Sequence, residues 1–247
     1  MTATTIPPDG PDLYACRFAD TALVVDYRTG QVSLLTIGRE GEAGAGSPAV
    51  DRPLTDRIRD RLGLSSRVAR SVRVVTGKTS ALSFGADESE AGLAENKNVN
   101  PTPVEVIASA VALAAVLLLK ASGPRERRMR RLTVLLGGVA LLRLQMATVA
   151  EAERGVLLIR RMGRWIPGRV ACLEESVAAT VALALLGRSV TWCHGVASDP
   201  VRLHAWVQTR DGDTGIPVAE PTSTGRYTIL RTIPEDPDHE GAHYDQH

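Results

Sequence analysis

The chain has 247 residues, of which 44% are hydrophobic, enough for one large domain or two small ones with packed cores. Its 29 Lys and Arg against 28 Asp and Glu leave a formal net charge of +1, so composition gives no electrostatic argument for nucleic acid as a partner. The three cysteines, Cys16, Cys172 and Cys193, are too irregularly spaced for a disulfide framework or a zinc site, and no metal is expected. Because the N-terminus lacks a basic start followed by an apolar stretch, we expect no secretory signal and a reducing, cytoplasmic location.

The first third of the chain, residues 1–85, predicts a small β-rich domain. Four runs have the composition of β-strands: residues 22–27, 31–35, 72–75 and 81–84. The first two flank a turn in which Gly30 can supply a positive φ, which predicts a hairpin, and the last two predict a second hairpin. A short helix is expected at 54–62. Residues 86–103 are polar and end in Asn-Pro-Thr-Pro, which predicts a linker between two domains.

A second domain is expected over residues 104–234, followed by a disordered, acidic tail at 235–247. Three runs predict helices, at residues 106–119, 132–149 and 150–165. The first is apolar but has only fourteen residues, fewer than the roughly 18 that span a membrane, so a buried core helix is favoured and no membrane span is expected. The basic run at 125–131 is typical of a solvated helix start. The alternative is that it binds an anionic surface or an acidic peptide.

Cys172 is the first residue with a chemical signal. It follows the break at Pro167-Gly168 and precedes an Ala-, Leu- and Val-rich run that ends before Gly187, so it should lie in the first turn of a helix of roughly four turns. Unpaired N–H groups and the positive end of the helix dipole favour the thiolate there, and the thiolate is the nucleophile. The alternative is a small buried hydrophobic residue, as most free cysteines are.

Residues that could assist Cys172 lie on the strands that follow. Three antiparallel strands are predicted at residues 190–196, 201–208 and 216–220. They would carry His204 as a base and Glu220, sixteen residues later, as the acid that orients it. Asp211 and Asp213, in the intervening turn, are the alternative acids. Taken singly, His204 is better explained as a satisfied strand histidine and Glu220 as a solvated edge carboxylate.

Three further residues on these strands are expected to be structural. Cys193 and His194 form an apparent rival pair, but adjacent strand residues face opposite sides of a sheet and cannot serve one site. Trp206 shares the face of His204 and is expected either to wall the cleft or to pack in the core.

Two sequence motifs resemble the histidine and acid strands of transglutaminase-like cysteine enzymes: His204-Ala-Trp-Val207 and Val218-Ala-Glu-Pro221. The usual sequences of these strands are His-Ala-Trp-Val-Glu and Val-Asp-Pro. Further matching positions bring the chain closer to the lasso-peptide B proteins: Cys172-Leu173, Ser176 and Gly195-Val196. These proteins are leader peptidases, and the resemblance covers roughly residues 104–234. The chain departs from the pattern at Gln208, where the family often has Glu, and at Glu220, where it has Asp.

The resemblance implies an α+β fold in which helices pack on a small antiparallel sheet, as in transglutaminase and papain-like cysteine proteases. A small β-rich N-terminal domain would precede it in the chain. It implies a cysteine endopeptidase that cleaves the leader from a ribosomally synthesised lasso precursor peptide, with Cys172, His204 and Glu220 as its triad. The implied partners are the precursor peptide and a separate, asparagine-synthetase-like lasso cyclase that uses ATP.

No cofactor is expected in the chemistry of this chain, and a dependence on ATP is suggested only by the family. The N-terminal domain would be a winged-helix-type recognition domain for the leader or a structural cap. Two other functions stay open at this point. One is a non-catalytic precursor-binding or scaffold protein of the same fold. The other is an acyl transferase that uses the same three residues with an amine in place of water.

Overall fold

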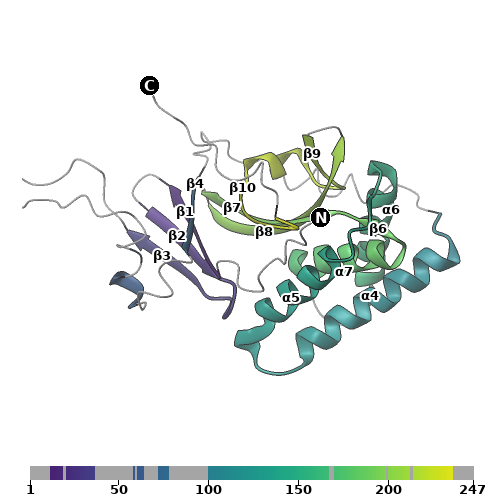
Figure 1. Ribbon diagram of the computed structural model, residues 1–247, viewed down its shortest axis with the longest axis horizontal. Coiled ribbons are helices and arrows are strands. Elements are labelled where there is room, and N and C mark those ends of the chain that lie inside the picture. Colours follow the sequence, from purple (N-terminus) through teal and green to yellow (C-terminus); the bar gives the residue numbers. More distant parts are fainter. Residues whose placement is uncertain are drawn as a thin grey trace, which may run out of the picture.

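The computed structural model contains two four-stranded sheets and a layer of helices (Figure 1). It describes residues 12–18, 21–36, 58, 60–63, 72–77, 100–166, 170–198, 200–211 and 214–235. The β-prone run at 81–84, most of the expected linker and nearly all of the expected tail lie outside these residues.

The first sheet is formed by the N-terminal third of the chain. Its strands are β1 (Leu13–Phe18), β2 (Thr21–Asp26), β3 (Val32–Thr36) and β4 (Val72–Thr76), in the order β3-β2-β1-β4. The predicted hairpin is confirmed, since β2 and β3 pair antiparallel and Gly30 has a φ of +73°. β4 pairs with β1 in parallel, an arrangement that needs a long connection and that no tight turn can supply. Of the helix predicted at 54–62, the described residues 58 and 60–62 are helical, and Ile58 is fully buried.

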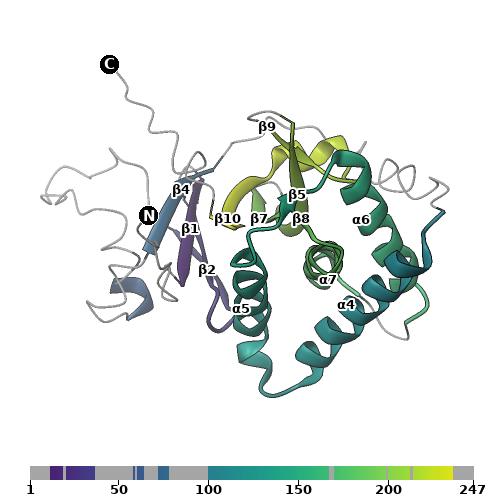
Figure 2. The ribbon, with the colours of Figure 1, turned by 45° about the vertical axis from the view of Figure 1, so that its right-hand side comes forward.

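Four α-helices and one 3-10 turn form the helical layer: α4 (Pro103–Ala121), η1 (Arg125–Arg127), α5 (Arg128–Ala140), α6 (Val149–Gly163) and α7 (Cys172–Leu185). Figure 2 looks along α7, which lies at the centre with the other three helices around it. One face of α7 contacts the second sheet, chiefly β8. The helix that carries Cys172 is thus held on all sides.

The helix α4 confirms and extends the prediction at 106–119. Its buried face includes Ala112, Leu113 and Val116, and it packs against α7, α6 and α5. Its other face exposes large apolar side chains: Val104, Ile107, Val111 and Leu118. At 19 residues it also has the length and composition of a helix that could cross a membrane.

The helix predicted at 132–149 is wrong in its second half. α5 ends at Ala140, just after Gly137 and Gly138, whose low helix propensity weakens its last turn. Arg143 then adopts a φ of +48°, and residues 145–146 form the short strand β5 (Gln145–Met146), which pairs with β6 (Arg188–Ser189). Residues 141–148 therefore connect two helices.

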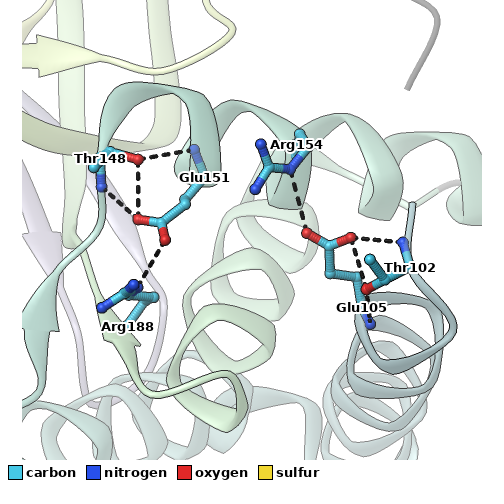
Figure 3. A network of polar contacts seen from close by, with 6 residues as sticks. All are labelled: Thr102, Glu105, Thr148, Glu151, Arg154 and Arg188. Carbon is cyan, nitrogen blue, oxygen red and sulfur yellow. Dashed lines mark hydrogen bonds and ion pairs between the residues drawn. The ribbon is translucent and has the colours of Figure 1, made fainter. Parts of the chain in front are cut away.

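Two sets of polar contacts hold the starts of α4 and α6 (Figure 3). One contains Thr102, Glu105 and Arg154, and the other contains Thr148, Glu151 and Arg188. In each capping box the threonine hydroxyl accepts the N–H of the glutamate three residues later, and that carboxylate accepts the N–H of the threonine. Each glutamate also binds an arginine of another element, at 3.2 Å for Arg154 and 2.9 Å for Arg188. A small pocket lies beside these contacts at the C-terminal end of α7, whereas Cys172 begins that helix.

The second sheet contains His204, the base predicted from the sequence. Its strands are β7 (Thr191–Ser198), β8 (Val201–Asp211), β9 (Thr214–Pro217) and β10 (Thr228–Ile233), in the antiparallel order β10-β7-β8-β9. The three strands predicted here exist, but the third ends at Pro217. The predicted strand placement of Glu220 is therefore wrong. Ala219 has a φ of +53°, which breaks an extended strand, and Glu220 lies between β9 and the 3-10 turn η2 (Thr222–Arg226).

The two sheets meet through buried aromatic and basic side chains. The Tyr27 hydroxyl lies 2.5 Å from Nδ1 of His194 on β7, and the Arg231 guanidinium of β10 lies over the rings of Tyr14 and Tyr27, at 5.4 and 4.8 Å. Side chains of β1 and β2 belong to the same hydrophobic cluster as those of the helices. The N-terminal sheet is therefore packed directly on the rest of the described chain.

Candidate active site

Cys172 is the first residue of α7, so its predicted position in the first turn is confirmed. The residue before it, Ala171, donates its backbone N–H to Glu174 at 3.1 Å. Glu174 is buried and also pairs with Lys120 of α4 at 2.7 Å. These contacts hold the start of α7, and with it the sulfur, against the neighbouring helix.

The structure brings the three predicted site residues together. His204, on β8, is hydrogen-bonded to the thiol of Cys172, and its Nε2 lies 2.7 Å from Oε2 of Glu220. Because Nε2 faces the carboxylate, Nδ1 is the ring nitrogen left for the sulfur. The side chain of His204 is 22% exposed and that of Glu220 only 3%, and Cys172 is partly buried, so solvent can reach the sulfur and the imidazole but hardly the carboxylate.

The surroundings favour a thiolate and an imidazolium. Burial by itself raises the pKa of Cys172, but the hydrogen bond and charge of His204, with backbone hydrogen bonds of Ala205 and Leu173, outweigh it and leave the pKa below its usual value. Burial lowers the pKa of His204, yet its contacts with Cys172 and Glu220 raise it to about 9. The two shifts act in the same direction: both favour a thiolate–imidazolium ion pair, the reactive state of a cysteine nucleophile.

The other two cysteines are in different environments. Burial raises the pKa of Cys16 to about 12. Cys193 is fully buried within β7. Its neighbour His194 is also buried and bonded to Tyr27, and burial, followed by the charges of His204 and Arg231, lowers its pKa to about 4. The rival pair of Cys193 and His194 is thus part of the core.

Aromatic rings pack around His204. Trp206, on the same face of β8, stacks on the imidazole with ring centroids 5.7 Å apart, and Tyr227 lies against it at 5.3 Å. Opposite His204 on β7 is Gly195, where a Cβ atom would lie only 2.8 Å from the Trp206 ring and from the Thr228 carbonyl oxygen. This glycine lets the indole lie close to β7 and keep the imidazole in place.

Of the two alternative acids, only the backbone of Asp211 is described, and it is distant from His204. Asp211 is the last residue of β8, seven residues beyond His204, which corresponds to roughly 23 Å along an extended strand. Asp213 lies outside the described residues. The carboxylate in contact with His204 is that of Glu220, which also accepts a weak hydrogen bond from Thr224 at 3.4 Å.

Sequence reasoning missed Arg160 of α6. One of its terminal nitrogens binds Oε1 of Glu220 and the other donates to the carbonyl oxygen of Ala219, both at 2.5 Å. Its Nε lies 3.6 Å from a carboxylate oxygen of Glu175 on α7. The sequence offers no local signal for this role, because Arg160 is one of several arginines near the end of α6 and its partners lie about sixty residues away.

The arrangement is that of cysteine enzymes in which a helix carries the nucleophile and a strand carries the base, with a carboxylate orienting the base. Residues 111–232 match the family model described as Transglutaminase-like superfamily. The match runs from within α4 to β10 and includes Cys172, His204 and Glu220, and it supports the superfamily predicted from the motifs. No curated protein and no solved structure matches the chain. Among the described residues, no group of three His, Cys, Asp or Glu side chains could hold a metal ion.

Proposed function

We propose that this protein is a cytoplasmic cysteine endopeptidase that removes the leader from a ribosomally synthesised lasso precursor peptide. The observation that carries the proposal is the hydrogen-bonded series from Cys172 through His204 to Glu220 at the start of α7. The superfamily match supports this class of chemistry. The narrower assignment to leader peptidases depends on the motifs Cys-Leu, Gly-Val and His-Ala-Trp-Val in their order along the chain.

In the first half of the reaction the thiolate of Cys172 attacks the carbonyl carbon of the peptide bond that joins leader and core. N–H groups of the first turn of α7 have no carbonyl partner within the helix and stabilise the oxyanion that forms. His204, as imidazolium, donates its Nδ1 proton to the leaving nitrogen when the C–N bond breaks. The core peptide leaves with a free amine, and the leader remains as a thioester on Cys172.

In the second half a water molecule replaces the core amine. Neutral His204 takes a proton from the water while the water oxygen attacks the thioester carbonyl. The sulfur of Cys172 then leaves as a thiolate. The leader departs with a new carboxylate, and the ion pair is restored. Glu220 accepts the Nε2 proton of the ring throughout, which keeps Nδ1 facing the sulfur.

Two partners follow from the resemblance. One is the leader, which we propose adds as a strand to an edge of the N-terminal sheet. The edge strand β3 exposes Val32 and Leu34, and a free strand edge offers main-chain hydrogen bonds to an extended peptide. The other is an asparagine-synthetase-like cyclase that would use ATP to close the freed core amine onto a side chain.

Acyl transfer is the second candidate, because the transglutaminase-like superfamily fits both proteases and acyl transferases. The two outcomes separate in one experiment. The purified protein is incubated with a precursor peptide in ¹⁸O-labelled water, with and without an added amine, and the products are weighed by mass spectrometry. Hydrolysis places one ¹⁸O in the leader carboxylate, whereas transfer places the amine there. If neither product forms and the peptide only binds, the protein is a scaffold.

A further inference from the structure

Arg160 binds the Glu220 carboxylate through the oxygen that does not face His204. Both oxygens of the Glu220 carboxylate are engaged, Oε2 by His204 at 2.7 Å and Oε1 by Arg160 at 2.5 Å. The carboxylate is almost fully buried, so water cannot easily replace either partner. A carboxylate that lost its contact with Arg160 could rotate away from the imidazole.

The same guanidinium holds the backbone that presents the acid. Ala219 has a φ of +53°, a left-handed conformation that is unfavourable for a residue other than glycine. Its carbonyl oxygen accepts the second terminal N–H of Arg160. The planar fork of one arginine therefore fixes both the left-handed turn and the carboxylate that follows it, and a lysine could not make both contacts with the same geometry.

Arg160 also joins the site to the helices. It extends from α6, reaches the turn after β9, and pairs with Glu175 in the first turn of α7, three residues after the nucleophile. The pKa of His204 is set by its burial and by its contacts with Cys172 and Glu220. This points to an action of Arg160 through the position of Glu220 and not through its own charge on the imidazole.

We propose that Arg160 is a positioning residue that keeps Glu220 against His204 and so maintains the thiolate of Cys172. The inference deepens the proposed function and rests on it for the role of the triad. It can be measured without any substrate, because the reactivity of the Cys172 thiol reports the state of His204 directly.

The test is a double-mutant cycle between Arg160 and Glu220, read as the rate of Cys172 alkylation by iodoacetamide between pH 5 and 9. R160K and R160Q should each slow alkylation at pH 6 about tenfold and move the acid limb of the profile upward. In an E220Q background the same changes should cost less than about twofold, since Arg160 then has no carboxylate to position. R154K is the matched control, because Arg154 lies on the same helix and pairs with Glu105.

A precursor-cleavage assay gives the second readout. With R160K the kcat should fall by about ten- to a hundredfold while KM stays within about twofold, because Arg160 contacts the acid and not the substrate. The inference would be overturned if both Arg160 variants fold and their Cys172 is alkylated at the wild-type rate. It would also be overturned if the Arg160 changes slow alkylation equally in the wild-type and E220Q backgrounds. Neither result would contradict the protease proposal. A chain that cleaves no precursor but shows the expected cycle would retain the inference and lose the proposed function.

Discussion

The contact between His204 and Glu220 makes a quantitative prediction for E220Q. In the wild type Glu220 accepts the Nε2 proton of His204 and leaves Nδ1 for the sulfur. A glutamine can present its N–H to Nε2 and so favour the tautomer whose Nδ1 carries the proton. In that tautomer the ring cannot accept the proton of Cys172, so the ion pair is weakened and turnover falls.

The size of the loss follows from the pKa of His204, which is raised from 6.5 to about 9. At about 1.4 kcal/mol per pKa unit, this corresponds to roughly 3 kcal/mol in favour of the imidazolium. Cys172 and Glu220 share the effect, so the carboxylate contributes on the order of 1.5 kcal/mol, or about tenfold. The lost orientation adds to this, with about four orders of magnitude known for the corresponding change in serine proteases as the upper limit. We therefore expect a ten- to thousandfold fall in kcat.

The assay is cleavage of a synthetic precursor peptide followed by chromatography, with circular dichroism to check that E220Q is folded. The matched controls are D211N and D213N, which change the two alternative acids and should cost less than about twofold. Full activity of E220Q together with inactivity of either aspartate variant would refute the reasoning, because the acid would then lie in the turn between β8 and β9.

The remaining predictions concern the nucleophile and its ionisation. C172A should abolish cleavage, whereas C16A and C193A should keep most of it, and near wild-type processing by C172A would remove the protease assignment. Brief iodoacetamide treatment at neutral pH, mapped by mass spectrometry, should label Cys172 first, and H204A should slow that labelling; preferential labelling of Cys193 would count against the site. Cleavage should decline as pH rises through about 9, where His204 loses the proton that it donates to the leaving amine. A rate that stays constant to pH 10.5 would show that the imidazolium is not the acid.

The parts of the site that were predicted from sequence are those encoded by local patterns. The start of α7 could be located because a Pro-Gly break and a C-terminal glycine bracket an apolar run, and Gly187 indeed has a φ of +76°. The facing of His204 and Trp206 followed from the period of two along a strand, and their rings stack. Such signals depend only on residues within a few positions of one another.

Errors arose where a local pattern met a tertiary constraint. The apolar run after α5 continues in sequence to Val149, but its end pairs as a strand with residues 188–189, and Thr148 caps the next helix. In the same way Ile216–Glu220 has a strand-like composition, yet Ala219 takes a left-handed conformation. Glu220 therefore does contact His204, but from a turn and not from the predicted strand. A strand would have alternated its side chains, whereas the turn directs this carboxylate at His204.

Arg160 shows why the support of an active site is harder to predict than its chemistry. A nucleophile and its base must be particular residue types in particular local settings, and those settings leave a signature in the sequence. The group that holds the acid must only supply donors at the right point in space, so it can come from any element that passes nearby. Here it comes from α6, about sixty residues before its partners and next to Arg161, which the sequence does not distinguish from it. The left-handed Ala219 and the glutamate in place of aspartate both fit this support, since the longer side chain must reach His204 from a turn and needs a second contact to stay there.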